Sequence, residues 1–198
     1  MKFVLISQKI SLDKHKQLNF SLESNWVNFL KKRNVIAVPI ISEDKDIDNY
    51  FKKYKPSHLI ISGGNDVFHN SKADKLRRRL DKKLIKISFK RKIPILAVCY
   101  GFQFVAKLFG GQVVKFKNES KKYHNIYFEK KKISVNSFHN YSIKRIPKEF
   151  KILAKHQNNT IEVVFSKKYK ILCTMFHPER KNKSQSYVDN LLFSYLKI

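Results

Sequence analysis

Short apolar runs alternate with amphipathic stretches through the first half of the chain, and this alternation constrains the fold more than any other feature. Patterns typical of buried strands begin at Lys2, Val35, His58 and Ile93. Apolar residues at helical spacing lie between them, notably within residues 22–33 and 73–87. Because strands that alternate with helices form parallel sheets covered on both faces, we predict an α/β fold with a mostly parallel central sheet.

The pattern changes after Gly111. Short alternating runs, typical of extended strands, are centred on Ile126, Val135, Leu153, Val163 and Leu172. They predict additional antiparallel or edge strands in the second half, and residues 186–198 predict a final amphipathic helix. No internal repeat or low-complexity linker is visible, so we expect one domain over residues 1–198.

The opening MKFVLIS is too short an apolar run for a signal peptide. No segment approaches the roughly 20 apolar residues of a membrane-spanning helix, so we expect a cytoplasmic protein without a membrane partner. Two cysteines, Cys99 and Cys173, are too few for a secreted disulfide scaffold. Both are expected to be thiols, with Cys173 buried in the core.

The formal net charge of +27 raises the question of a polyanionic partner. Lysine supplies most of this charge, whereas arginine is preferred for bidentate phosphate recognition. The lysines are also scattered along the chain. We therefore favour a solvated lysine-rich surface over nucleic-acid binding, and we interpret the run of arginines from Arg77 as a solvated helix face. A small substrate that carries phosphate remains compatible with the charge.

Only five glycines occur, and three of them, Gly63, Gly64 and Gly101, stand at two predicted strand ends. In PILAVCYGFQ the strand ends at Cys99, and Tyr100 and Gly101 lead into a helix, which is the order of a nucleophile elbow. The helix dipole there stabilises a thiolate, and the N–H of Tyr100 would face an oxyanion. A buried core cysteine is the alternative interpretation, but the adjacent glycine and helix favour a nucleophile.

Three motifs together resemble the class I glutamine amidotransferases. CYGFQ from Cys99 resembles their C-x-G-x-Q elbow, FHPER at residues 176–180 resembles their H-P-E tripeptide, and SGGND from Ser62 resembles their oxyanion loop. The motifs occur in the family's order and cover nearly the whole chain. The resemblance implies the family's flavodoxin-like fold, a catalytic triad of Cys99, His177 and Glu179, and no metal or organic cofactor. One departure is Ala97, where the family usually has glycine.

The branch of the family is suggested by GGND, in place of the common GGPG, and by NSFHN from Asn136. Both resemble stand-alone gamma-glutamyl hydrolases, and the nearest likeness is to bacterial hydrolases of nucleotide-linked gamma-glutamyl amidates. The resemblance implies an oxyanion hole made by Gly64 and Tyr100. It implies substrate contacts from the following residues: Gly63, Asn65, Asp66, Gln103, Asn136, Ser137, Phe138 and His139.

Several alternatives stay open. The chain is interpreted as a gamma-glutamyl hydrolase acting on a small molecule, as a glutaminase subunit that passes ammonia to a synthetase, or as an inactive family member that binds a ligand or nucleic acid. The leaving group is undetermined, with polyamine derivatives among the candidates, and a homodimer is left open. No metal site is expected, because the remaining histidines lack ligand spacing in the sequence: His15, His58, His69, His124 and His156.

Overall fold

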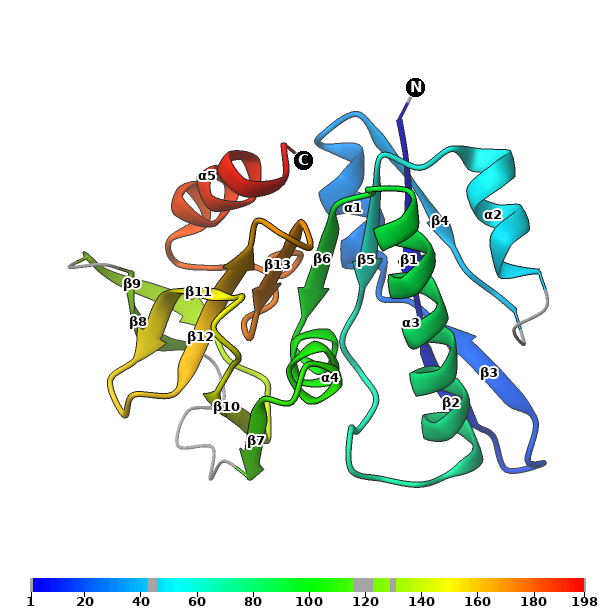
Figure 1. Cartoon of the computed structure of the whole chain (residues 1–198), viewed down its shortest axis with the longest axis horizontal. Coiled ribbons are helices and arrows are strands. Elements are labelled where there is room, and N and C mark those ends of the chain that lie inside the picture. Colours follow the sequence, from blue (N-terminus) through cyan, green and yellow to red (C-terminus); the bar gives the residue numbers. More distant parts are fainter. Residues whose placement is uncertain (1, 43–45, 116–122, 129–130, 198) are drawn as a thin grey trace.

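A parallel five-stranded core lies at the centre of the computed structural model, which describes residues 2–42, 46–115, 123–128 and 131–197. In spatial order it consists of β4 (Val35–Pro39), β1 (Lys2–Ser7), β5 (His58–Ile61), β6 (Ile95–Val98) and β13 (Ile171–Thr174). All four residues of β5, β6 and β13 are buried, as expected for strands covered on both faces. The predicted parallel α/β sheet is confirmed (Figure 1).

Antiparallel strands from the second half extend this core beyond β13, as predicted, but the predicted run at Leu172 is β13 itself, which pairs in parallel with β6 inside the core. They follow in the order β12 (Ile161–Ser166), β11 (Lys151–His156), β8 (Tyr123–Phe128) and β9 (Lys131–Asn136). A branch adds β10 (Tyr141–Arg145) against β12, and β7 (Gln112–Lys115) against β10. Among the described residues the sheet therefore has eleven strands, and its parallel half carries the strand ends at which the motifs lie.

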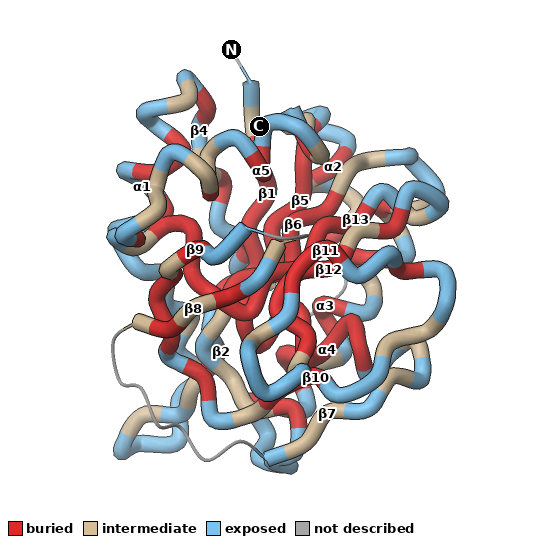
Figure 2. Tube along the Cα trace, turned by 90° about the vertical axis from the view of Figure 1, so that its left-hand side faces the viewer, coloured by how far each residue is buried: buried red, intermediate tan, exposed pale blue. Residues whose placement is uncertain are grey.

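Helices cover both faces of the sheet, and each face has its own apolar core. On one face, α2 (Ile47–Tyr54), α3 (Lys72–Lys90) and α4 (Tyr100–Leu108) supply buried side chains. On the other face, α1 (Ser24–Lys31) and α5 (Gln185–Leu196) do so. Figure 2 shows buried residues concentrated along the strands and exposed residues in the outer loops. None of the helices in the described ranges is long and apolar enough to cross a membrane.

A small hairpin, the strands β7 and β10, and one helix were not predicted. The hairpin pairs β2 (Lys9–Leu12) with β3 (Leu18–Ser21) as a separate two-stranded sheet. Each strand of the hairpin has only four residues, which are too few to show a clear periodic pattern. The helix α2 escaped prediction for a similar reason, because it has only eight residues. Tertiary bonds hold the hairpin in place: Asn65 accepts the Ile10 N–H at 2.9 Å and donates to the Ile10 carbonyl at 2.8 Å.

The interpretation of Arg77 as part of a solvated helix face is wrong. Arg77 is only 1% exposed, and its Nε donates to the equally buried Asp81 at 2.6 Å. Its Nη2 also donates to Ser7 Oγ at 2.8 Å and to the Ser62 carbonyl at 3.0 Å. Arg77 thus ties α3 to the carboxyl ends of β1 and β5. A buried charge of this kind is tolerated because it is paired and hydrogen-bonded.

Candidate active site

The turn between β6 and α4 places Cys99 in a conformation that few non-glycine residues adopt. Its φ is 53° and its ψ is −105°, while its own N–H donates to the Thr174 carbonyl at 2.8 Å. Two residues on, Gly101 passes so close to β5 that a Cβ would lie 2.2 Å from the Ile61 carbonyl oxygen. Strain of this kind is characteristic of functional positions. The sharp turn leaves Cys99 8% exposed at the end of the sheet.

His177 and Glu179 lie on the loop after β13, next to this turn. His177 Nδ1 is 2.7 Å from Glu179 Oε1, and both side chains are largely buried. Asn136 at the end of β9 holds the His177 backbone from both sides: its Nδ2 donates to the His177 carbonyl at 2.7 Å, and its Oδ1 accepts the His177 N–H at 2.8 Å. Gly63 leaves room for the imidazole, since a Cβ there would lie 2.9 Å from His177 Cε1.

The electrostatics of this group favour a protonated imidazole. Burial alone would lower the pKa of His177, but the hydrogen bond and charge of Cys99, together with those of Glu179, raise it from 6.5 to about 10. The other thiol behaves differently, because complete burial raises the pKa of Cys173 well above its usual value. The expected buried core position of Cys173 is confirmed. Cys99 is therefore the thiol placed for chemistry.

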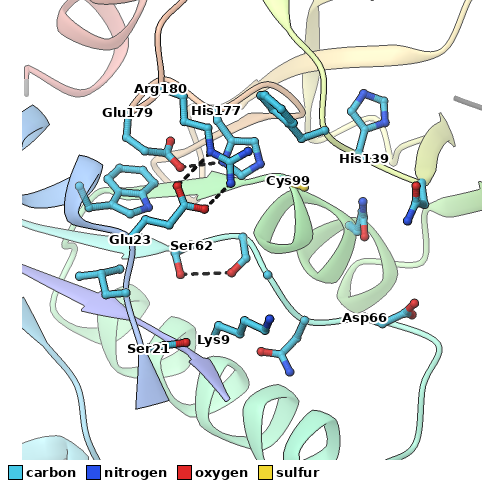
Figure 3. Close-up of a pocket in the computed structure, with 18 of the residues that line it drawn as sticks. Lys9, Ser21, Glu23, Ser62, Asp66, Cys99, His139, His177, Glu179 and Arg180 are labelled. Atoms are coloured by element: carbon cyan, nitrogen blue, oxygen red, sulfur yellow. Dashed lines mark hydrogen bonds and ion pairs between the residues drawn. The ribbon is translucent and has the colours of Figure 1, made fainter. Parts of the chain in front are cut away.

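A cavity of about 580 Å³ opens in front of these residues, within the size range of small-molecule sites. Figure 3 shows His139 on one side of Cys99, and Glu179, Arg180 and Glu23 on the other. Seven of the residues singled out for oxyanion or substrate contacts line it: Gly63, Gly64, Asn65, Asp66, Gln103, Phe138 and His139. The sequence motifs, which span residues 62–180 of the chain, thus meet at one site.

Three of the expected site residues lie outside the lining of this cavity. Asn136 and Ser137 are almost fully buried, and the Asn136 side chain is engaged with the backbone of His177. The Tyr100 ring is also buried and packs 5.0 Å from the Arg77 guanidinium. Tyr100 is the first residue of α4, so its N–H has no acceptor within the helix. Its backbone, rather than its side chain, is the part that suits an oxyanion site.

Asn65 and Asp66 line the cavity, but their side chains are also engaged in structural bonds. Asn65 clamps the β2–β3 hairpin through Ile10 and donates to Asp74 at 2.9 Å. Asp66 accepts the Tyr141 hydroxyl at 2.9 Å and the Phe68 N–H at 2.7 Å. These bonds fix the shape of the loop after β5. The backbone of that loop, with Gly64 at a φ of 114°, faces the cavity.

One wall of the cavity was not predicted from the sequence. It is formed by the hairpin, the start of α1 and the residue after the H-P-E tripeptide: Lys9, Ser21, Leu22, Glu23, Trp26 and Arg180. Glu23 forms an ion pair with Arg180, in which Arg180 Nε donates to Glu23 Oε2 at 3.0 Å. No local pattern could have indicated this wall, because these two residues are 157 positions apart.

Behind the opposite wall, three largely buried side chains gather from separate strands and loops. His124 Nε2 lies 3.2 Å from Glu162 Oε2, and His139 Nε2 lies 3.9 Å from Glu162 Oε1. Their ligand atoms all lie within 4.8 Å of one another, so the group suits either a shared proton or a metal ion. His139 Nδ1 also lies 2.9 Å from the Tyr141 carbonyl, which orients the ring at the edge of the cavity.

Comparisons with known proteins identify the family of the chain. The family model for glutamine amidotransferase class-I matches residues 12–194. A gamma-glutamyl-CDP-amidate hydrolase from Campylobacter jejuni is 31% identical over 186 residues, which cover 91% of each chain. A glutamine-hydrolysing GMP synthase from Brachyspira hyodysenteriae is 30% identical over 161 residues, but the match spans only 30% of that longer protein.

Solved structures resemble the fold. A putative GMP synthase component from Thermoplasma acidophilum superposes with a TM-score of 0.72, and the match covers 100% of this chain and 94% of the other. At 20% sequence identity, this similarity bears on the fold alone. The structural match covers the antiparallel extension of the sheet as well as its parallel core.

Proposed function

Because the chain belongs to the class I glutamine amidotransferase family, we propose that it hydrolyses a gamma-glutamyl amide through Cys99, His177 and Glu179. The observation that carries the proposal is the position of Cys99. A thiol at a strained strand-to-helix turn shares a cavity with an imidazole that is bonded to a buried carboxylate. A nucleophile, a base and a group that orients the base are the parts that covalent amide hydrolysis requires.

In the first half of the reaction, the Cys99 thiolate attacks the side-chain carbonyl carbon of the glutamyl group. A C–S bond forms, and the carbonyl oxygen becomes an oxyanion that the N–H groups of Gly64 and Tyr100 stabilise. Protonated His177 then gives its proton to the amide nitrogen, and the C–N bond breaks. The amine leaves, and the glutamyl group remains on Cys99 as a thioester.

In the second half, water attacks the thioester while neutral His177 accepts one of its protons. The C–S bond breaks, glutamate leaves, and the thiolate and imidazolium are restored. Glu179 keeps the imidazole in the required tautomer and stabilises its charge throughout. Asn136 acts indirectly by fixing the backbone of His177, so its part in the site is positioning rather than substrate contact.

For the substrate, we propose gamma-glutamyl-CDP-amidate, which would give glutamate and cytidine diphosphoramidate for capsular polysaccharide modification. Support comes from the Campylobacter jejuni hydrolase, which matches over 91% of both chains. Two properties of this chain are consistent with a large anionic substrate. They are the net charge of +27 and a cavity of about 580 Å³, which has room for more than glutamine.

A second candidate is a glutaminase subunit that delivers ammonia to a synthetase. The observation in its favour is the match to a glutamine-hydrolysing GMP synthase over 75% of this chain. In that case the lysine-rich surface would serve as a docking face. A hydrolase of gamma-glutamyl polyamines or aminobutyrate is a further variant of the first proposal, with a different amine as the leaving group.

The test compares three substrates that differ only in the leaving group: gamma-glutamyl-CDP-amidate, glutamine and gamma-glutamylputrescine. We expect the purified protein alone to release glutamate fastest from the CDP-amidate. Faster turnover of either other substrate would overturn the proposed substrate. Weak activity on all three that rises on addition of a synthetase would favour the glutaminase subunit.

Matched cysteine variants test the mechanism in the same assay. Cys99→Ala should fold but release no glutamate. Cys173→Ala keeps the proposed catalytic thiol and should release glutamate at close to the wild-type rate. Glutamate release by Cys99→Ala at the wild-type rate would disprove the proposed nucleophile.

A further inference from the structure

The wall that Glu23 and Arg180 form lies beside the group that must protonate the leaving amine. Arg180 follows His177 by three residues, and its backbone N–H donates to the His177 carbonyl at 3.3 Å. Figure 3 shows Glu23 and Arg180 on the side of Cys99 away from His139. The nitrogen that accepts the His177 proton is the first atom of the leaving group, so the start of that group must lie near His177. Arg180 lines the same cavity as His177 and Cys99.

Arg180 presents its guanidinium in the geometry that recognises phosphate. Its Nε and Nη2 both donate to the Glu23 carboxylate, as a two-pronged pair. Its Cζ also lies 4.4 Å from the centroid of the Phe138 ring, a cation–π contact. Two parallel N–H donors on a fixed plane bind a phosphate as well as they bind a carboxylate. Glu23 therefore occupies a site that would also accept a phosphate.

In the Glu23–Arg180 ion pair, a phosphate could replace Glu23 as the partner of Arg180. The Glu23 side chain is 46% exposed and that of Arg180 is 24% exposed, so water screens the attraction between them. The pair is nevertheless electrostatically coupled to the triad: the bond to Arg180 lowers the pKa of Glu23, and the charge of His177 lowers it further. An anion with more charge than one carboxylate could displace Glu23 at little cost.

Lys9 supplies a second cation in the same cavity. Its aliphatic stem packs against Gly64, where a Cβ would lie 3.0–3.1 Å from Lys9 carbons. The hairpin that carries Lys9 is clamped at the next residue by the two bonds between Asn65 and Ile10. Across the described residues, the Lys9 ammonium has no hydrogen-bond or ion-pair partner. An unpaired cation held over the oxyanion loop adds a positive charge that no side chain in the described ranges neutralises.

We infer that Arg180 and Lys9 form the binding site for a phosphate-bearing leaving group, and that Glu23 holds Arg180 in place until the substrate arrives. The inference rests on the proposed hydrolysis of gamma-glutamyl amides and identifies where their specificity would lie. With Glu23 displaced, the lining of the cavity offers two cationic side chains to the phosphates. A leaving amine without phosphate would have no anionic group for these two side chains to bind.

Binding of CDP and of pyrophosphate to the Cys99→Ala protein, followed by calorimetry, tests the inference without turnover. Arg180→Met and Lys9→Met, each combined with Cys99→Ala, should weaken CDP binding by about tenfold or more, since each loses a charged hydrogen bond. Glu23→Gln should strengthen it, because a competing carboxylate is removed. If the variants change the affinity for pyrophosphate as they change that for CDP, the site recognises the phosphates alone. If they change only the affinity for CDP, the nucleoside contributes to binding as well.

Turnover separates this inference from the proposed function. With Cys99 intact, Arg180→Met and Lys9→Met should raise KM for the CDP-amidate at least about tenfold more than KM for glutamine. Arg33→Met and Lys14→Met are matched controls, because Arg33 pairs with Asp189 and Lys14 lies in the hairpin turn, both outside the cavity lining. Both controls should keep wild-type KM values.

Two distinct failures are possible. If the CDP-amidate is not hydrolysed at all, the proposed substrate is wrong. If it is hydrolysed but neither CDP binding nor the KM ratio changes in Arg180→Met and Lys9→Met, the assignment of this site to the leaving group is wrong.

Discussion

His177 Nδ1 lies 2.7 Å from Oε1 of Glu179, and both side chains are shielded from water. The contact spans only two residues across Pro178, yet it orients the imidazole toward Cys99, whose hydrogen bond and charge help to raise the pKa of His177. The interaction between His177 and Cys99 joins the loop after β13 to the turn at the end of β6. The chemistry proposed for the chain depends on it.

Removal of the Glu179 charge should slow catalysis while leaving the fold intact. Glu179→Gln keeps the size of the side chain but loses the charge that selects the imidazole tautomer. By analogy with the orienting acid of serine hydrolases, we expect kcat to fall by about 10³–10⁴-fold. Steady-state glutamate release gives the measurement, and circular dichroism checks the fold. A kcat within a few-fold of wild type would remove Glu179 from the proposed triad.

The pKa of His177 predicts how stability depends on pH. Folding raises this pKa from 6.5 to about 10, so the protonated imidazole stabilises the folded state. This contribution is complete below pH 6.5 and is lost as the pH rises through about 10. The difference in free energy of unfolding between wild type and His177→Gln should therefore be largest below pH 6.5 and shrink toward pH 10.

Urea unfolding at a series of pH values measures that difference. Cys99→Ala serves as the comparison, because Cys99 is among the groups that raise the pKa of His177. Its loss should flatten the pH dependence. A wild-type advantage that stays constant over the whole range would contradict the raised pKa.

Gly101 should tolerate no side chain. A Cβ would lie 2.2 Å from the Ile61 carbonyl oxygen, so Gly101→Ala must separate α4 from β5. We expect a loss of about 3 kcal/mol in the free energy of unfolding, together with reduced activity, because the same turn holds Cys99. Gly110→Ala is the control: its Cβ would meet no atom within 4 Å, and its positive φ of 80° should cost only about 1–2 kcal/mol. Equal losses would show that the close approach is unimportant.

Loss of the buried Arg77 should destabilise the fold strongly. Arg77→Met leaves the Asp81 carboxylate, which is 0% exposed, without its cation. Removal of one partner from a buried ion pair costs about 3–5 kcal/mol, and the double variant Arg77→Met/Asp81→Leu should recover much of that loss. Arg79→Met, at an exposed position of the same helix, should change stability by less than about 1 kcal/mol. Chemical denaturation of the four proteins makes the comparison.

Local patterns were sufficient to predict most of the strands and most of the helices. The parallel strands show continuous apolar runs because both faces of the sheet are covered, and α3 shows its apolar stripe because one side packs on the sheet. The sharp turn at Cys99 was also predictable, because Gly101 is close to Cys99 in the chain and the constraint is local. The hairpin β2–β3 and α2 escaped prediction because four and eight residues show too little periodicity.

The polar contacts depend on tertiary structure. Arg77 was expected in water, because its position on an amphipathic helix does not reveal that Ser7 and Ser62 approach it from two strands. Likewise, the spacing of the histidines in the sequence gave no sign that Glu162 lies between His124 and His139.

The sequence by itself therefore determined the α/β class, the turn at Cys99 and the order of the motifs, because each follows from residues near one another in the chain. Only the tertiary structure decided which side chains share the cavity, and above all that Glu23 meets Arg180 across 157 positions. The physical reason is that periodicity identifies the face on which a residue lies, whereas its partner is set by how distant loops close over the sheet.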